Sequence, residues 1–561
     1  MMRKIFFNLL VLSLAGFFVV PAFAQSSAHD QGVSLAKEGK LKESLQVLEN
    51  AISENSSDTN CLADYIVVLT WDEQWQKAVD LYQKNSALTL PDYVLPEVGR
   101  AYRELGQYDT SYRIYTKYLS AHGDDANAHS GALLSALELK NYYTAHQHAD
   151  FLIARNPADP DFHLNKVRIY VRRDQLAKAQ EYLEKVIPAV EDNTKLRTAL
   201  GQIYLWRGWP RKALKEFEIT KDADKDYIEA NGGYASALNA TAQKKQARDH
   251  IGEALIKAPG NNRLRQVQRG FEVEDMAWTT LRAYNTKEFP GEDEVFFSER
   301  VDKNIYHQYK IFTEYVRRLI TNQPEDDIAQ RIYLGDEWQP NDGWTLVGGI
   351  SANSENGEGL GGLGQLVLTP DDFWAFRFRY DSKAIDIPLR SRIQGTQASD
   401  YSWSLAYRAS ELFNTTAGLS LRNYTDGNEN WSYFWYTDTE VYTSAGWKLR
   451  IGTDLYLSTN SDQTVPYFSP GHNYSFYVTP MVEHVWFRHV NRSWIDRFYV
   501  GAGQIWQENF NGENAGFIRY EQDHQLAERL ICAVGTTYSL NNYDGANSNR
   551  LQVYTTVKFG F

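Results

Sequence analysis

The side chains of this sequence best placed to do chemistry are carboxylates and tyrosines spaced two residues apart in its C-terminal half. Asp438 and Glu440 form one such pair, and Glu521 and Asp523 form another. Alternate residues of a β-strand share a face, so each pair would present two carboxylates on the same side of a sheet. Carboxylates that line a cleft with low-dielectric walls concentrate cations.

Extending this alternation along each expected strand assigns eleven side chains to the inner face of a channel. They are the acids Glu314, Asp381, Asp438, Glu440, Asp454, Glu483, Glu521 and Asp523 and the tyrosines Tyr456, Tyr477 and Tyr554. A slip of one residue would reverse any of these assignments. The tyrosines could stack on sugar rings or pack against the wall, and acids outside the strands, such as Glu292, are better explained as solvated loop residues.

The sequence has no residue motif typical of catalysis or metal binding. The 12 histidines, His484 and His489 among them, do not sit in a motif with Ser or Asp, and there is no CxxC or HExxH spacing. Cys61 and Cys532 lie in different halves of the chain. We therefore expect no catalytic residue, no metal and no cofactor, although Glu521 and Asp523 could imitate the acid pair of a hydrolase.

The strands that carry the acids follow an exported and largely helical half. Arg3 and Lys4, the apolar stretch 5–20 and the sequence Ala22-Phe23-Ala24 have the pattern of a signal peptide at residues 1–24, with the mature chain starting at Gln25. An uncleaved anchor helix is the alternative. Beyond residue 24 the sequence has no apolar run long enough for a spanning helix, so any later membrane span must consist of strands.

A period of 34 residues organises the stretch from about 28 to 263. Small residues recur in phase, and they are Ser44, Ala78, Ser111, Ala145, Ala179, Ala213 and Ala247. This period is typical of tetratricopeptide (TPR) helix pairs, in which a small residue lets neighbouring helices approach closely. We expect about seven repeats, which form a solenoid with a concave groove. Candidates for the groove are Trp71, Trp75, Trp206 and Trp209, with packing between helices as the alternative role.

From about residue 276 the helical period is replaced by an alternation of apolar and polar residues with a period of two. Leu551, Val553, Val557, Phe559 and Phe561 share one face of the last expected strand, with polar residues between them. This pattern fits a sandwich or a membrane barrel, and the aromatic strand ends, the preceding signal peptide and the final Phe561 favour the barrel. We count about sixteen strands, which start near residues 276, 294, 308, 327, 343, 361, 373, 400, 413, 432, 447, 474, 496, 516, 530 and 549.

These observations predict an α + β multidomain chain, in which an α-solenoid of TPR helix pairs precedes a 16-stranded antiparallel transmembrane β-barrel. The expected parts are a signal peptide (1–24), a periplasmic TPR domain (25–263), a linker (264–275) and an outer-membrane barrel (276–561). A barrel of sixteen strands is wide enough for an aqueous channel. Almost all of the formal net charge of −13 lies in residues 275–561, which predicts an acidic lumen.

Three stretches resemble the PgaA-type export porins for poly-β-1,6-N-acetylglucosamine. They are residues 400–428 (DYSWSLAYRASELFNTTAGLSLRNYTDGN), 465–473 (VPYFSPGHN) and 518–545 (IRYEQDHQLAERLICAVGTTYSLNNYDG). The order of TPR and barrel also matches, whereas the helical part is shorter than is usual in that family. This departure leaves open whether the chain engages the usual periplasmic partner or exports another polymer.

The resemblance implies export of a biofilm exopolysaccharide, partly de-N-acetylated poly-N-acetylglucosamine, across the bacterial outer membrane. It implies a periplasmic polysaccharide deacetylase as partner, with the TPR groove holding that enzyme or guiding the polymer, and no catalytic role. The barrel would also contact outer-membrane lipid and the barrel-assembly machinery, and we expect no nucleic-acid partner. The alternative function is an outer-membrane receptor or scaffold whose TPR array organises envelope proteins.

Overall fold

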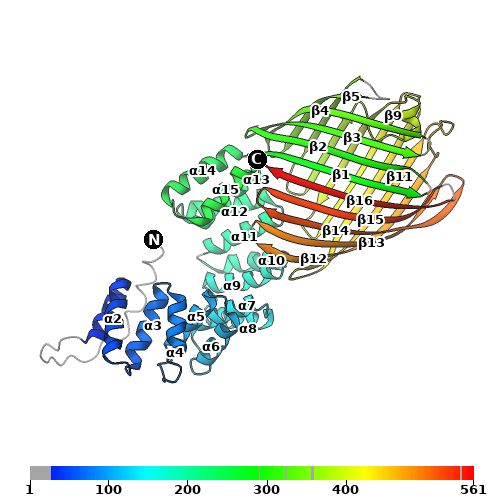
Figure 1. Cartoon of the computed structure of the whole chain (residues 1–561). Coiled ribbons are helices and arrows are strands. Elements are labelled where there is room, and N and C mark those ends of the chain that lie inside the picture. The colour runs from blue at the N-terminus through cyan, green and yellow to red at the C-terminus, as the bar shows by residue number, and fades with distance from the viewer. Residues whose placement is uncertain are drawn as a thin grey trace. The chain divides into compact units, whose positions relative to one another are not determined.

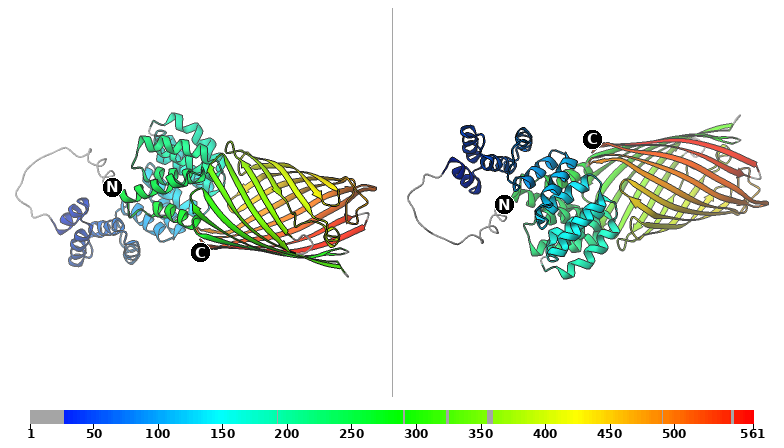
Figure 2. Two further views of the ribbon diagram at one scale, coloured as in Figure 1. Left: turned by 90° about the horizontal axis from the view of Figure 1, so that it is seen from above. Right: turned by 90° about the horizontal axis from the view of Figure 1, so that it is seen from below.

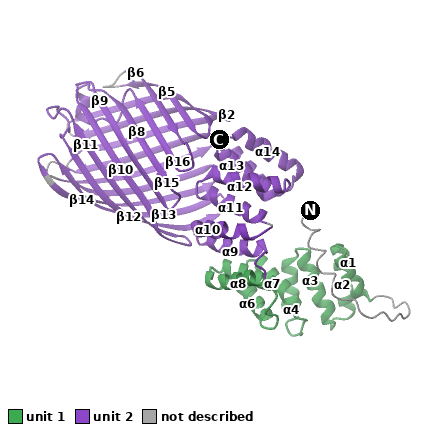
Figure 3. Ribbon diagram, turned by 180° about the vertical axis from the view of Figure 1, so that it is seen from behind, with its two compact units in different colours: residues 1–155 green, residues 156–561 purple. Residues whose placement is uncertain are grey.

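In the computed structural model the chain forms an array of helix pairs followed by a closed barrel of sixteen antiparallel strands (Figure 1, Figure 2). The structure describes residues 27–191, 193–289, 291–322, 325–354, 359–489, 491–543 and 546–561. The expected signal peptide lies outside these ranges. The chain divides between Arg155 and Asn156 into two compact units (Figure 3), and each is described by itself.

Seven helix pairs and one further helix make up the helical part within the described residues. Unit 1 holds α1 (Ala28–Lys37), α2 (Leu41–Glu54), α3 (Thr59–Trp71), α4 (Trp75–Lys84), α5 (Val94–Glu104), α6 (Tyr108–Leu119), α7 (Ala126–Glu138) and α8 (Tyr142–Arg155). Unit 2 begins with α9 (Pro160–Arg172), α10 (Leu176–Val186), the short 3-10 helix η2 (Ile187–Ala189), α11 (Thr194–Trp206), α12 (Pro210–Ala223), α13 (Ile228–Ala240), α14 (Lys244–Lys257) and α15 (Asn262–Glu274).

The small residues of the 34-residue period lie where the two helices of each pair meet. All seven, from Ser44 to Ala247, have 0 % exposed surface. Two of them also bond the partner helix, because the Ser44 hydroxyl donates to the Gly32 carbonyl at 2.7 Å and Ser111 donates to the Gly99 carbonyl at 2.7 Å. Larger side chains at these positions would force the helices apart. The predicted TPR array is confirmed.

The turn inside each pair repeats one backbone conformation. Its key residue is left-handed in all seven pairs, and three of the seven are glycines, Gly39, Gly106 and Gly208, with φ of 80°, 75° and 81°. In the first pair the next amide, that of Lys40, donates to the Leu35 carbonyl at 2.9 Å and closes the end of α1. The other pairs carry non-glycine residues there at some cost in strain, and these are Glu73, Lys140, Asp174 and Ala242.

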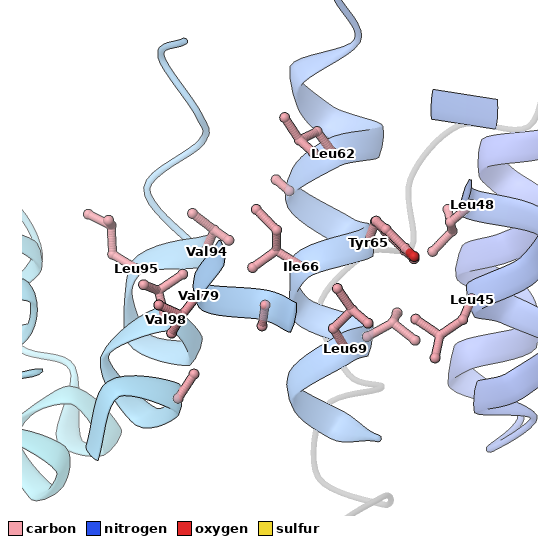
Figure 4. Close-up of a cluster of buried hydrophobic side chains, with 14 of the residues drawn as sticks. Leu45, Leu48, Leu62, Tyr65, Ile66, Leu69, Val79, Val94, Leu95 and Val98 are labelled. Atoms are coloured by element: carbon pink, nitrogen blue, oxygen red, sulfur yellow. The ribbon is translucent and has the colours of Figure 1, made fainter. Parts of the chain in front are cut away.

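Apolar side chains from successive helices of unit 1 fill its core. Figure 4 shows Leu45 and Leu48 of α2 facing Tyr65 and Leu69 of α3, while Ile66 points to the other side of α3, toward Val94 of α5. Leu48, Ile66 and Leu69 have 0 % exposed surface. Burial of side chains this size stabilises the fold by roughly 1.5–3 kcal/mol each.

The stretch 264–275, expected to be a linker, is helical instead. It forms most of α15, which Asn261 caps by accepting a hydrogen bond from the Leu264 amide at 3.1 Å. Leu264 and Phe271 pack with Ile251 of α14 in one buried cluster. These contacts let α15 close the last repeat and lead directly into the first strand.

The strands of the barrel are long and joined mostly by short turns. They are β1 (Ala277–Phe289), β2 (Asp293–Tyr306), β3 (Tyr309–Asn322), β4 (Glu325–Asn341), β5 (Trp344–Ser354), β6 (Gly359–Leu368), β7 (Trp374–Asp381), β8 (Ala398–Arg408), β9 (Phe413–Tyr424), β10 (Glu429–Ser444), β11 (Trp447–Asn460), β12 (Asn473–His489), β13 (Arg492–Gln507), β14 (Phe510–Ala527), β15 (Leu530–Tyr543) and β16 (Ala546–Gly560). One short helix, α16 (Leu389–Ile393), lies between β7 and β8.

The sheet closes on itself through β1 and β16, so its strands have no free edge. Trp278 stands opposite Gly560 at one end of this seam, and Phe289 stands opposite Asn549 at the other. Every neighbouring pair of strands is antiparallel. We call the barrel end at which α15 enters β1 the helix-side end, and the opposite end the far end. Within the part of the chain that is described, no helix is both long and apolar enough to cross a membrane.

Candidate functional site

The segment between β7 and β8, residues 382–397, identifies the inner face of the barrel wall. Arg318 of β3 donates to the Ile385 carbonyl at 3.2 Å, and Arg422 of β9 binds the Asp386 carboxylate at 2.9 Å. Strands β3 and β9 are six apart in a ring of sixteen, so a segment that contacts both must lie inside the barrel. Arg318 and Arg422 therefore mark the inner face.

This inner segment is packed against the wall near the far end of the barrel. Leu389 has 0 % exposed surface and Ile387 has 3 %. Arg392 of α16 forms a buried ion pair with Asp327 of β4 and donates to the Ile385 carbonyl at 3.0 Å. A cavity of about 30 Å³ remains between segment and wall, which is room for about one or two water molecules. The segment narrows the lumen at this level.

The strand register identifies which side chains face inward on every strand of the barrel. Side chains directly opposite each other on neighbouring strands share a face. Followed from Arg318 through each pairing, the inner face includes all eleven side chains expected there from the sequence. The outer face carries exposed large apolar residues, among them Ile332, Leu334, Trp403, Val482 and Val553. An apolar outer face and a polar inner face are the arrangement of a transmembrane barrel.

Most of the inner acids have a basic partner. Arg450 binds Asp438 at 2.7 Å and Glu440 at 3.3 Å. Arg497 binds Glu483 at 2.8 Å and also pairs with Asp523. Two further acids are held in the same way, Asp381 by Arg331 at 3.1 Å and Glu314 by Arg300 at 3.7 Å. The inner wall therefore carries charges of both signs, and most of its carboxylates are neutralised locally.

Asp454 and Glu521 are the exceptions among the candidate acids. Glu521 accepts hydrogen bonds from the hydroxyls of Tyr499, at 2.9 Å, and Tyr554. Asp454 has no ion pair among the described residues, although the charge of Arg519 acts on it. These two carboxylates, on β11 and β14, are the candidate acids without an ion-pair partner among the described residues.

Two of the candidate tyrosines lie directly over glycines of the neighbouring strand. A Cβ atom on Gly535 would stand 2.3 Å from the Tyr554 ring, and one on Gly503 would stand 2.7 Å from the Tyr477 ring. Tyr456 instead exchanges a hydrogen bond with Ser432 at 3.1 Å. The glycines let the rings lie against the wall, which leaves their other faces toward the lumen.

The basic partners of the inner acids were missed by the sequence analysis. Arg450 and Arg497 occur in the same alternation as the acids, which is the signal that could have revealed them. Only the register shows that Arg450 faces Glu440 and that Arg497 stands between Glu483 and Glu521.

A second polar site joins the helices of unit 2 to the turns at the helix-side end of the barrel. Arg211 of α12 binds the Asp342 carboxylate at 2.6 Å and donates to the carbonyls of Asp342, at 2.8 Å, and Thr369, at 2.6 Å. Arg207 pairs with Glu411 at 2.9 Å. We call the contacts of α12 and of the turn between α11 and α12 with the turns β4–β5, β6–β7 and β8–β9 the rim contact.

Asp372, in the turn before β7, caps helix α12 from outside. Its two carboxylate oxygens accept hydrogen bonds from the amides of Arg211 and Lys212, both at 3.1 Å. The first amides of a helix have no partner within the helix, and its N-terminus carries partial positive charge. The Asp372 carboxylate accepts hydrogen bonds from these amides and balances the partial positive charge, so it stabilises the start of α12 at the barrel rim.

The four candidate groove tryptophans have different roles. Trp209 is only 7 % exposed, donates to the Ala409 carbonyl at 3.0 Å and packs on Phe373, so it belongs to the rim contact and not to a free groove. Trp75 packs against the core of unit 1. Trp71 and Trp206 are 40 % and 50 % exposed and remain candidates for the groove. The sequence places Trp209 on the helical period but carries no sign of its partner 200 residues away.

Across the described ranges, no cluster of three or more His, Cys, Asp or Glu side chains could hold a metal ion. Cys61 and Cys532 are both free thiols. The described side chains of the inner wall can attract charged groups, form hydrogen bonds and present aromatic rings.

The fold and the wall together define a membrane β-barrel with an appended helical-repeat domain. Residues 293–561 match the family model for the PgaA membrane β-barrel domain, and residues 136–203 match a tetratricopeptide-repeat model. The C-terminal part of the chain is similar to the PgaA membrane β-barrel domain, and the part before it carries TPRs. The closed sixteen-stranded barrel and this match indicate an outer-membrane barrel protein.

Two similar solved structures share little sequence with this chain. A bacterial polysaccharide outer membrane secretin is 16 % identical, covers 52 % of this chain and 99 % of its own, and has a TM-score of 0.48. A tetratricopeptide repeat protein from Parabacteroides merdae is 16 % identical, covers 43 % of this chain and 96 % of its own, and has a TM-score of 0.38. A search of curated proteins finds no match.

Proposed function

We propose that the barrel exports an exopolysaccharide, partly de-N-acetylated poly-N-acetylglucosamine, across the bacterial outer membrane. De-N-acetylation leaves primary amines, a fraction of which is protonated, and therefore cationic, near neutral pH. The polymer would pass from the helix-side end, in the periplasm, to the far end at the cell surface. In this proposal the chain is a conduit and has no catalytic step.

The observation that carries the proposal is the carboxylate and tyrosine lining of one part of the inner wall. Asp454 and Glu521 are not neutralised by arginine, and the rings of Tyr477 and Tyr554 lie beside them on β12 and β16. Ammonium groups are attracted by such carboxylates, and sugar faces can stack on such rings. The attraction is local, because most other acids of the wall are paired. The similarity of the barrel to the PgaA membrane β-barrel domain supports a polysaccharide as cargo.

The helical part has a supporting role in this proposal. The rim contact holds α11 and α12 at the turns of the barrel entrance, so a polymer or a periplasmic deacetylase bound to the repeats would be delivered there. The exposed Trp206, at the end of α11, directly precedes Arg207 of this contact and is a candidate for either ligand. TPR arrays bind partners through such exposed groove residues.

The test is polymer secretion by a strain that lacks the gene, with the secreted sugar identified. We expect the polymer to disappear from the medium while the synthase stays active, and plasmid-borne protein to restore it. Intact secretion would refute export and favour a receptor or scaffold function for the barrel. Measuring polymer retained inside the cells separates a loss of export from a loss of synthesis.

The electrostatic part is tested by the double variant D454N/E521Q. Electrostatic focusing changes association rates by roughly 10-fold or more, so export should fall at least about threefold. The control is Glu299→Gln, which removes one negative charge on the outer face of β2. Heat-modifiable migration in electrophoresis checks that the barrel folds in each variant. Unchanged export by D454N/E521Q, with the barrel folded, would remove the carboxylates from the mechanism.

A further inference from the structure

A recess of opposite charge lies on the inner wall at strands β6 to β10. It has a volume of about 410 Å³, within the range of small-ligand sites, and is open toward the lumen. Its inner-face lining consists of Gln365, Arg377, Arg379, Ser402, Ser404 and Phe434. We call these six residues the basic recess, because its only ionisable side chains are arginines.

The two arginines of the recess are available to a ligand. Within the described part of the chain Arg377 forms no ion pair, and it is exposed to the lumen. Arg379 lies 3.6 Å from Asp381, but that carboxylate is already bound more closely by Arg331, at 3.1 Å, and by the Tyr333 hydroxyl, at 2.8 Å. Arg377 and Arg379 are two residues apart on β7, so their guanidinium groups point into the same space.

The rest of the lining suits a saccharide. Ser402 and Ser404 stand directly opposite Arg379 and Arg377 on β8 and offer hydroxyls beside each guanidinium group. The Phe434 ring lies over Gly418, where a Cβ atom would stand 2.3 Å from its Cζ atom. The glycine lets the ring lie against the wall and turn its free face to the lumen.

We propose that the basic recess binds an oxyanion, a carboxylate or phosphate group, carried on a saccharide unit that stacks on Phe434. Planar guanidinium groups bind such oxyanions through two parallel hydrogen bonds, which a lysine cannot provide. Two guanidinium groups without a competing carboxylate between them form a site for one anionic group. The hydroxyls of Ser402 and Ser404 bind the sugar to which that group is attached.

The claim that a saccharide bears the oxyanion rests on the proposed export function, whereas the claim of an oxyanion site does not. If a free anion is the natural ligand, the same arginines bind inorganic phosphate and the sugar contacts contribute nothing. If the anion belongs to the cargo, the exported glycan carries some acidic substituents as well as amines. The two sources differ in whether the Phe434 ring contributes to affinity.

Equilibrium binding to the purified full-length chain in detergent tests the proposal, with titration calorimetry as the readout. The probes are trigalacturonate, which is anionic, chitotriose, which is neutral and of similar length, and inorganic phosphate. We expect trigalacturonate to bind at least tenfold more tightly than chitotriose, and the variant R377Q/R379Q to lose at least tenfold of that affinity. Arg282→Gln, which removes an inner-face arginine of β1 outside the recess, is the matched control and should bind as the unaltered chain does.

A second variant, Gly418→Ala, assigns the source of the oxyanion. The added methyl group displaces the Phe434 ring without changing a charge. Weaker trigalacturonate binding with unchanged phosphate binding identifies a saccharide ligand, and equal behaviour of the two probes identifies free phosphate. Binding of both probes that does not depend on Arg377 and Arg379, or no binding of either, would overturn the site. Neither result bears on secretion by the deletion strain, so failure of the recess and failure of export remain distinct.

Discussion

Removing the Arg211 side chain should release α12 from the barrel rim. The side chain makes three hydrogen bonds to the turns β4–β5 and β6–β7, at 2.6, 2.8 and 2.6 Å. Hydrogen bonds to charged groups contribute about 1.5–3 kcal/mol each when buried. Arg211 and Asp342 keep 24 % and 37 % of their side-chain surface exposed, so solvent screening reduces this contribution. We take about 3 kcal/mol for the loss of all three in Arg211→Ala.

This free energy corresponds to about a 100-fold rise in the population of undocked helix, because each 1.4 kcal/mol is a factor of ten. Hydrogen exchange of the full-length chain in detergent measures that population at the first amides of α12, where Asp372 accepts from Arg211 and Lys212. Exchange there should accelerate by about two orders of magnitude in Arg211→Ala. Lys215→Ala, an exposed position on the same helix, is the control. Equal exchange in both variants would show that the rim contact does not hold the helix.

Three further changes have defined outcomes. Burial lowers the pKa of His148 to about 4, so the folded unit 1 keeps this side chain neutral at pH values where the unfolded chain protonates it. The stability of unit 1 should therefore be highest above pH 6.5 and fall as the pH drops from 6.5 toward 4. His148→Gln should flatten this pH dependence of the unfolding temperature. In Gly233→Ala the new methyl group would stand 2.3 Å from the Phe217 ring, so we expect a loss of about 1–3 kcal/mol in thermal or denaturant unfolding, and an unchanged midpoint would contradict the packing. Arg392→Gln removes the guanidinium group that pairs with the buried Asp327, at a cost of about 3–5 kcal/mol, and should raise single-channel conductance in planar bilayers by freeing the inner segment. Unaltered conductance would mean that this pair does not hold the segment.

The elements were predictable because each has a strong local period. The helical repeat shows in the sequence through small residues 33 or 34 apart, and the strands β9, β11 and β15 begin at residues 413, 447 and 530, where alternation of two predicted them. The beginnings of β13 and β14 were wrong by four and six residues. Both strands continue past the aromatic stretch into polar residues at their ends, such as Arg492 and Asn514, which resemble a turn in the sequence.

The prediction of a linker at residues 264–275 was wrong for a related reason. The small residues of the period lie in the second helix of each pair, and the next position of the period, residue 281, already lies in β1, so the period gives no signal within 264–275. Tertiary packing of Leu264 and Phe271 makes this stretch helical. A repeat period that arises from contacts between successive helices gives no signal for the helix at which the array ends.

The faces of the strands were predictable, but the partners across them were not. Alternation alone put Glu483 and Asp523 on the inner face, where the register has them. It gave no sign that Arg497 would bind both, since that depends on which residues of β12, β13 and β14 stand opposite each other. Bulges, such as the one between Val485 and Phe487, shift that register without leaving a signal in composition.

The register also changes what the net charge means. An acidic total predicts a uniformly acidic channel, yet arginines neutralise most inner acids, and the unpaired charges that remain fall on different strands. Asp454 and Glu521 lie on β11 and β14, and Arg377 lies on β7. Strands β7 and β14 are seven apart in a ring of sixteen, so the carboxylate of Glu521 and the guanidinium group of Arg377 are on nearly opposite walls. A polymer between them meets a field directed across the lumen. Such a field orients a chain that carries both amines and acidic groups, whereas a uniformly acidic wall would attract only its amines.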